Sequence, residues 1–209
     1  EGELSVTARS DQSIRADVVA ASVAVAASST VGISLAGAGA VAVNEGAAAV
    51  RAEIEGAGSD THRITADEIE VEALNLVDIY SGVGAAAVSV AASTGGGLAL
   101  AVSAGIARNT INAETVARIA DFAADNAIDV RNGGISVIAS TDEENTDKRL
   151  NIEAISVAAA VSVAGAKDFA LALSGAGADA RNLISGRTVA EVADIAGASA
   201  GSVTVQALN

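Results

Sequence analysis

The densest group of side chains that could do chemistry is an acidic stretch, TDEENTDK, at residues 141–148. Its carboxylates are Asp142, Glu143, Glu144 and Asp147. Ca²⁺ prefers several carboxylate or carbonyl oxygens, so these side chains are candidate calcium ligands. The stretch occurs once in the chain, and a run of charged residues also forms an ordinary solvated loop. The sequence leaves both possibilities open, and calcium is the one cofactor it suggests.

The remaining residues offer few candidates for an enzyme active site. The chain has no Cys and a single histidine, His62, so neither a thiolate zinc site nor a catalytic triad is predicted. The triple glycine at 95–97 lies within a strand pattern and lacks the lysine of a phosphate-binding loop. A carbohydrate-active β-helix would carry acids on neighbouring repeats, but Glu70 is matched by Ser136 and Thr204. We therefore expect a protein that is not an enzyme.

Charge and composition narrow the class of protein further. The formal net charge is −14, which disfavours binding to nucleic acid or to an anionic membrane surface. Hydrophobic residues make up 51% of the chain and aromatic residues only 1%, so the core must consist of Val, Ile, Leu and Ala. Small side chains fill a core only where backbones approach closely, and this favours thin, closely stacked sheets.

The chain repeats itself about three times. Short alternating segments recur around four valines, with steps of 65, 66 and 68 residues: Val6, Val71, Val137 and Val205. We expect these valines to stack in a parallel, all-β solenoid. The repeats span residues 1–66, 67–133 and 134–200, and a fourth begins at 201–209, as in a fragment of a longer array.

Each repeat also contains a long uncharged run, such as Val18–Val43 and Gly82–Ala107. These runs are long enough to cross a membrane as helices. Their apolar residues alternate with period two, and the third copy carries Lys167 and Asp168, so we expect strands and no membrane span.

Each run is predicted to form two strands, which join near Ser28–Val31, Ser93–Gly97 and Gly165–Asp168. Separate short strands such as Leu4–Ala8 and Val50–Ile54 would flank them. Ala47–Gly56 could instead form a short helix, because alanine favours helix. Thr141–Lys148 is an insertion peculiar to the third repeat, and it should lie in a surface loop.

An asparagine ends the long run in every repeat: Asn44, Asn109 and Asn182. Asparagines at one corner of successive coils can bond to one another through their amides and form a structural ladder. The alternative is a simple turn residue, because Asn tolerates a left-handed backbone. Neither interpretation is catalytic.

The two faces of the long strands differ in side-chain size. We expect Val23, Leu35 and their equivalents to fill the core. The opposite face would consist of Ala, Gly and Ser, represented by Ala36, Ala101 and Ala172. Such a flat face should be covered, either within the chain or by a second copy. The sequence therefore predicts self-association, with the protein itself as its main partner.

The repeated pattern VAASVAVAAS…GISLAGAGAVAVN…VRAEI resembles the Ala/Gly/Val-rich repeats of giant bacterial secreted or cell-surface proteins described as adhesin-like or haemagglutinin-like. The resemblance covers the whole chain and includes no site motif. It implies an extracellular β-solenoid stalk or fibre, secreted or at the cell surface, with a cell-surface or polysaccharide ligand as a possible partner. The alternative is a calcium-dependent or carbohydrate-binding surface module.

Overall fold

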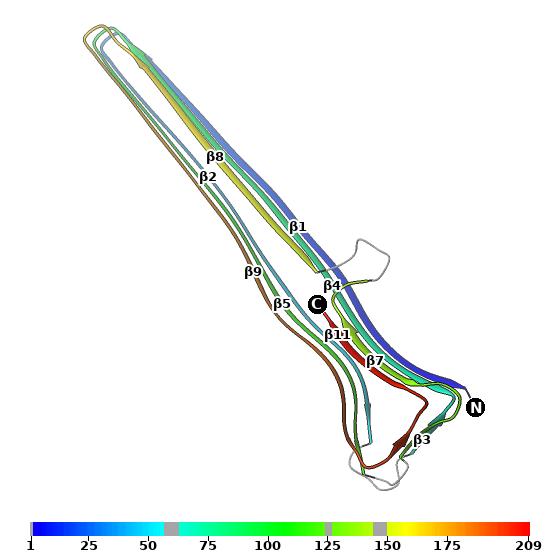
Figure 1. Cartoon of the computed structure of the whole chain (residues 1–209). Coiled ribbons are helices and arrows are strands. Elements are labelled where there is room, and N and C mark those ends of the chain that lie inside the picture. Colours follow the sequence, from blue (N-terminus) through cyan, green and yellow to red (C-terminus); the bar gives the residue numbers. More distant parts are fainter. Residues whose placement is uncertain (1, 57–62, 124–126, 144–149) are drawn as a thin grey trace.

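The computed structural model describes residues 2–56, 63–123, 127–143 and 150–209. Within them the chain is all-β and winds into a long, flattened β-solenoid (Figure 1). Its strands are β1 (Glu3–Ser28), β2 (Val31–Glu55), β3 (Ile64–Ala66), β4 (Glu68–Ser93), β5 (Gly96–Phe122), β6 (Ile128–Val130), β7 (Ile135–Ser140), β8 (Asn151–Gly165), β9 (Phe169–Ile195), β10 (Ala198–Ser199) and β11 (Val203–Leu208).

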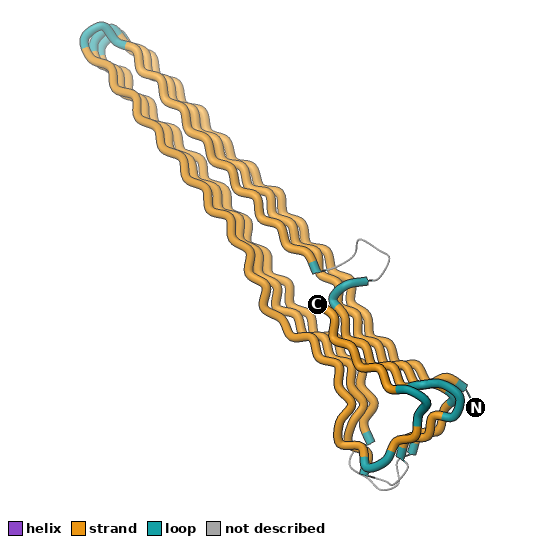
Figure 2. Tube along the Cα trace, in the orientation of Figure 1, coloured by secondary structure: helices purple, strands orange, loops and turns teal. Residues whose placement is uncertain are grey.

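The coils stack in parallel and form three sheets. Sheet A has the order β1-β4-β7-β11, and β8 also pairs with β4. Sheet B has the order β2-β5-β9, and the short sheet C has the order β10-β6-β3. Sheets A and B run side by side for most of the molecule, and sheet C closes a triangular base (Figure 2). The predicted all-β solenoid with parallel stacking is confirmed.

The register between coils also agrees with the sequence. Val71 pairs with Val6 and with Val137, which in turn pairs with Val205. The pairing of β1 with β4 is unbroken from Glu3 to Ser28. The strand breaks at the far tip fall after Ser28, Ser93 and Gly165, where they were expected.

The division of each repeat into four strand segments is wrong. The short segments are continuous with the long runs, so β1 and β2 contain 26 and 25 residues. At about 3.3 Å per residue, each spans roughly 80 Å. The possible helix at Ala47–Gly56 is also wrong, because β2 continues through it to Glu55. Only the third coil interrupts its first long strand, between β7 and β8, where the predicted insertion lies.

The assignment of the two faces is reversed in the structure. Val23 is 71% exposed and Leu35 is 62% exposed, whereas Ala36 is 7% exposed and Ala101 is fully buried. A strand without bulges keeps one set of alternate residues inside along its whole length. Because Leu4 of β1 packs against the basal core, every second residue after it also faces inward, and this places Val23 outside.

The interior narrows from the base to the tip. Around the triangular base, large side chains such as Ile69, Ile119 and Phe122 form the main core. Further along, the cluster consists almost entirely of alanines, including Ala36, Ala87 and Ala101. We call this narrow part the distal arm, and it comprises residues 18–42, 83–107 and 156–180. Small side chains let two sheets approach more closely than the usual spacing of about 10 Å.

A left-handed corner recurs at the end of the long strands of sheet B. Asp121 and Asp194 have φ angles of 63° and 53°. They occupy equivalent positions, because Ala120 pairs with Ala193 and Phe122 with Ile195. Aspartate adopts the left-handed region more readily than most residues. The repeated Ala-Asp pair therefore marks the corner at which the chain leaves sheet B for sheet C in both coils.

Two glycines of sheet B allow the close packing of the arm to be tested. A Cβ added at Gly105 would lie 2.8 Å from Ser156 Oγ and 3.3 Å from the Val157 carbonyl oxygen, across the interior. A Cβ at Gly39 would meet no atom within 4 Å. Gly105→Ala is expected to destabilise the fold by about 1–2 kcal/mol through overpacking. Gly39→Ala should stabilise it by about 0.5 kcal/mol, since alanine loses less backbone entropy. Urea unfolding of the two variants measures both changes, and equal shifts would contradict the close approach.

Candidate functional site

The structure brings the three asparagines into one hydrogen-bonded row inside the solenoid. Asn44 Nδ2 donates to Asn109 Oδ1 at 3.1 Å, and Asn109 Nδ2 donates to Asn182 Oδ1 at 3.2 Å. Each amide also donates across the interior to a carbonyl oxygen of sheet A. The acceptors are Tyr80 for Asn44, Glu153 for Asn109 and Ile152 for Asn182. The row therefore links successive coils and also links the two sheets, which is a structural role.

Serine hydroxyls make further links across the interior of the distal arm. Ser89 Oγ of β4 donates to the Ser34 carbonyl oxygen of β2 at 2.8 Å. Ser103 Oγ of β5 donates to the Ala159 carbonyl oxygen of β8, also at 2.8 Å. These bonds satisfy hydroxyl groups that would otherwise be costly to bury. Both bonds therefore join sheet A to sheet B within the arm.

The outer surface of sheet B in the distal arm, here called face B, is covered with large apolar side chains. Two adjacent rows across the three strands are entirely bulky: Ile33, Leu98 and Leu171 form the first, and Leu35, Leu100 and Leu173 form the second. Ile33, Leu35 and Leu173 are exposed to solvent. Phe169 and Val31 extend this apolar surface to the tip. Such a continuous exposed patch is typical of an interaction surface.

The rows that follow on face B are small on the two outer strands, β2 and β9, whereas the central strand β5 keeps one large residue, Val102. The next two rows toward the base are Gly37, Val102 and Gly175, then Gly39, Ala104 and Gly177. Added Cβ atoms at Gly39, Gly175 and Gly177 would meet nothing within 4 Å, so the packing of this chain does not require glycine there. Glycine inside a strand weakens the strand and often marks a place where another backbone approaches closely.

The outer surface of sheet A in the distal arm, here called face A, is also apolar but more even. Its exposed side chains include Val19, Val23 and Val25 of β1, and Val157 and Val161 of β8. Sequence reasoning missed both outer faces as apolar surfaces. The signal that finds them is the alternation carried unbroken from the polar base into the uncharged run.

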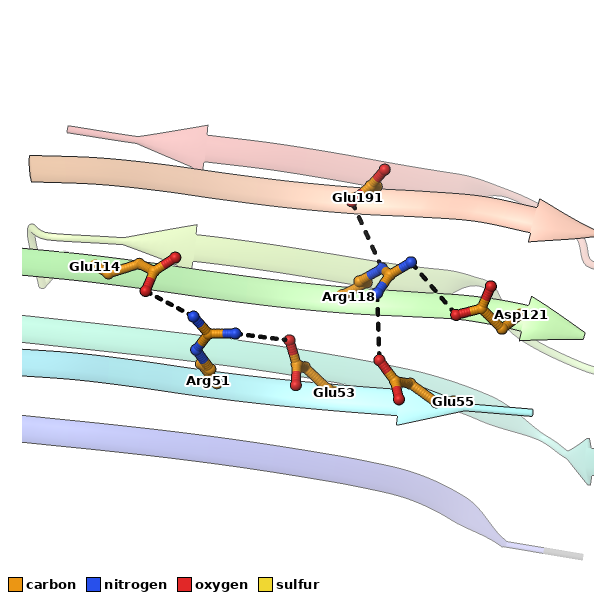
Figure 3. Close-up of polar contacts among 7 residues, drawn as sticks. All are labelled: Arg51, Glu53, Glu55, Glu114, Arg118, Asp121 and Glu191. Carbon is orange, nitrogen blue, oxygen red and sulfur yellow. Dashed lines mark hydrogen bonds and ion pairs between the residues drawn. The ribbon is translucent and has the colours of Figure 1, made fainter. Parts of the chain in front are cut away.

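The outer surface of sheet B at the base carries ion pairs instead. Arg51 donates to Glu114 at 2.7 Å, and Arg118 lies within ion-pair distance of Glu55, Asp121 and Glu191 (Figure 3). The hydrogen bond to Glu114 raises the pKa of the Arg51 guanidinium above its ordinary value. Glu55, Arg118 and Glu191 come from three successive coils, so this network ties the coils together. Solvent screening keeps each exposed pair weak.

The acidic stretch is only partly described. Glu144 and Asp147 lie outside the described residues, as does His62. Glu143 accepts a hydrogen bond of 2.6 Å from Arg9 Nη1, and this bond raises the pKa of Arg9. An arginine that already neutralises Glu143 competes with a cation for the same oxygen atoms. Among the described residues no group of three potential ligands is close enough to hold a metal ion.

A groove of about 380 Å³ lies beside Glu143, on the outer surface of sheet A at the base. Two register rows line it, together with the residues that follow β7. Its polar lining residues are Thr7, Arg9, Glu72, Ser140, Asp142, Glu143 and Gln206, and Leu74, Ile138 and Leu208 add an apolar part. The polar side chains offer donors and acceptors to a small polar ligand, and none of the lining residues is aromatic.

The predicted self-association face is wrong for Ala36 and Ala101. Both lie between the sheets and pack against Ala87 of the opposite sheet, so the same chain covers them. Ala172 is exposed, because β9 pairs with a described strand, β5, along one edge only. It pairs with Ala99 rather than with Ala101. The inward side chains are small because the two sheets meet there.

Comparison of the chain with protein-family models, with curated proteins and with solved structures finds no match. Within the described residues, no helix has the length and apolar character needed to cross a membrane.

Proposed function

We propose that this chain is a structural segment of an extracellular fibre or adhesin stalk, secreted or held at the cell surface, that associates with copies of itself. The observation that carries the proposal is the long parallel register between coils. Twenty-six residues of β1 pair one for one with β4, and β5 continues the same pairing to β9. Such a stack can extend by adding coils, because each coil edge presents the backbone groups that the next one needs.

Other features support a mechanical rather than a chemical role. Asn109 joins coils and sheets at once, and the ion pairs of Arg118 span three coils. The interior of the distal arm is packed mainly with alanine, together with Val83 and with serines such as Ser89 and Ser103 that bond across it. The resemblance to adhesin-like repeats fits this role and supplies the extracellular setting.

Electron microscopy and fibre diffraction of the concentrated protein test the proposal. We expect rods or filaments that lengthen with protein concentration, with a repeat of about 4.8 Å along the stacking axis. Strands would then lie perpendicular to the filament axis. Discrete particles of constant size at every concentration would contradict a role in fibre assembly.

The basal groove favours a second candidate function, a surface module that binds a carbohydrate or a calcium-dependent polar ligand. Arg9, Glu72 and Gln206 supply the hydrogen-bonding groups that recognise sugar hydroxyls. Binding to a polysaccharide panel, measured with and without a chelator, tests this candidate. Arg9→Ala should abolish the binding, and a melting temperature lowered by the chelator would indicate bound calcium.

A further inference from the structure

We propose that two copies of this chain pair face to face through face B, with their strands antiparallel. This inference rests on the proposed structural role and names the surface and the geometry of lateral contact. Face B, rather than face A, is assigned because its exposed side chains are larger. Ile33, Leu35 and Phe169 are all more than half exposed.

Face B is complementary to itself when the second copy is turned around. We place a twofold axis parallel to the stacking direction, between the row of Leu35 and the row of Gly37. Rotation about this axis makes the strands of the second copy run antiparallel to those of the first. The row of Leu35 then faces the row of Gly37 in the second copy. The row of Ile33 likewise faces the row of Gly39. On strands β2 and β9, large side chains therefore meet glycines on both sides of the axis. On the central strand β5, Leu98 faces Ala104 of the second copy, and Leu100 meets Val102 in an apolar contact.

Charge favours the same arrangement. The net charge of −14 resists association in general. The first two coils have no charged residue from Val18 to Val43 or from Gly82 to Ala107, so their apolar rows meet without burying a charge. In the third coil Asp179 lies in the row nearest the base, where it forms an ion pair with Arg108. Antiparallel pairing also places the two acidic bases at opposite ends of the pair. Parallel pairing would bring the bases side by side and would cost more through repulsion between like charges.

The area of face B predicts how tightly the copies associate. Six outward rows over three strands cover about 36 Å by 14 Å, or roughly 500 Å² on each copy. The total of about 1,000 Å² is at the lower limit for a specific interface. A three-coil segment should therefore form a weak, reversible pair, and the contact strengthens with each coil added to the stack.

Sedimentation velocity over a range of protein concentrations tests the contact. The wild-type chain should form a dimer at micromolar or higher concentration. The double variant Leu35→Glu, Leu173→Glu should weaken the pair at least tenfold, because it places charges opposite an apolar surface. Gly39→Leu should also weaken the pair, because it places a large side chain where the second copy needs a small one. A Cβ at this position meets no atom of its own chain within 4 Å.

The matched control changes face A instead. Val23 and Val161 are as exposed as the two leucines, and they project from the opposite side of the arm. Val23→Glu, Val161→Glu should leave the dimer unchanged. If this control weakens the dimer as much as the leucine variant does, or if the wild-type chain stays monomeric, the assignment to face B is overturned.

Cross-linking tests the antiparallel register directly, because the chain has no native cysteine. A mixture of Leu35→Cys and Gly37→Cys chains should link faster with a short bismaleimide than either variant does alone. Faster linking of Leu35→Cys to itself would overturn the antiparallel arrangement. If filaments still form and the face B variants do not change lateral pairing, this inference alone is refuted. The absence of filaments, with lateral pairing intact, would refute only the proposed stacking role.

Discussion

Ala101→Asp is expected to unfold the distal arm, whereas Val102→Asp, at the next position, is expected to leave the chain folded. Ala101 is fully buried in the central coil, between Ala36 of the neighbouring strand and Ala87 of the opposite sheet. An aspartate there must hold an unpaired charge in a dry layer that has no space for its carboxylate. Val102 points the other way and is 50% exposed.

The expected difference between these two variants is large. Burying an unpaired charge and overpacking the interior should together cost more than about 4 kcal/mol at Ala101. At Val102 the cost is the lower strand propensity of aspartate, about 1 kcal/mol or less. Urea unfolding followed by circular dichroism, at a protein concentration below dimer formation, measures both. Similar midpoints would contradict the burial of Ala101 in a dry layer, and a lower midpoint for Val102→Asp would show that the inward and outward sets have been exchanged.

The register and the strand breaks of this fold could be predicted from the sequence because they depend on spacing alone. The steps between Val6, Val71 and Val137 fix which residues lie one above another in a parallel stack. The asparagine row follows from the same spacing. Its bonds to the Tyr80 and Glu153 carbonyl oxygens depend on the distance between sheets A and B. The spacing of residues along the sequence does not predict that distance.

Which side chains of the distal arm point inward could also have been predicted. The prediction that Val23 and Leu35 fill the core was wrong for a physical reason. Hydrophobicity alone places Val23 and Leu35 inside, since buried valine and leucine stabilise a core most. Alternation counted from Leu4 without a break places them outside. Val23 and Leu35 lie outside because a strand cannot change which alternate residues face inward without a bulge. Long-range pairs such as Arg9 with Glu143 could not be foreseen, because they join an insertion to a distant strand.

Asn109→Ala should produce the second large effect, a loss of about 2–4 kcal/mol of stability. Asn109 is 1% exposed and is the central member of its row. The substitution removes its bonds to Asn182 and to the Glu153 carbonyl oxygen, and it removes the acceptor for Asn44. The Asn44 amide and the Glu153 carbonyl oxygen, which lose this partner, take part in part-buried bonds. Asn182→Ala, in the exposed end coil, is the matched control and should cost about 1 kcal/mol or less.

Asn109→Asp separates hydrogen bonding from simple loss of volume. The aspartate has nearly the same shape and can still accept a bond from Asn44. As a carboxylate it cannot donate to Glu153, whose carbonyl oxygen lies 2.6 Å from Asn109 Nδ2. Burial and this oxygen raise the pKa of the new carboxyl group, so its protonated form is the one that fits. At neutral pH the variant should therefore be less stable than Asn109→Ala, and it should regain stability relative to wild type as the pH falls through the raised pKa. Chemical unfolding of the three proteins at pH 7 and pH 5 measures this difference, and a pH-independent gap between Asn109→Asp and wild type would mean that water reaches the row and that the asparagines do not hold the sheets together.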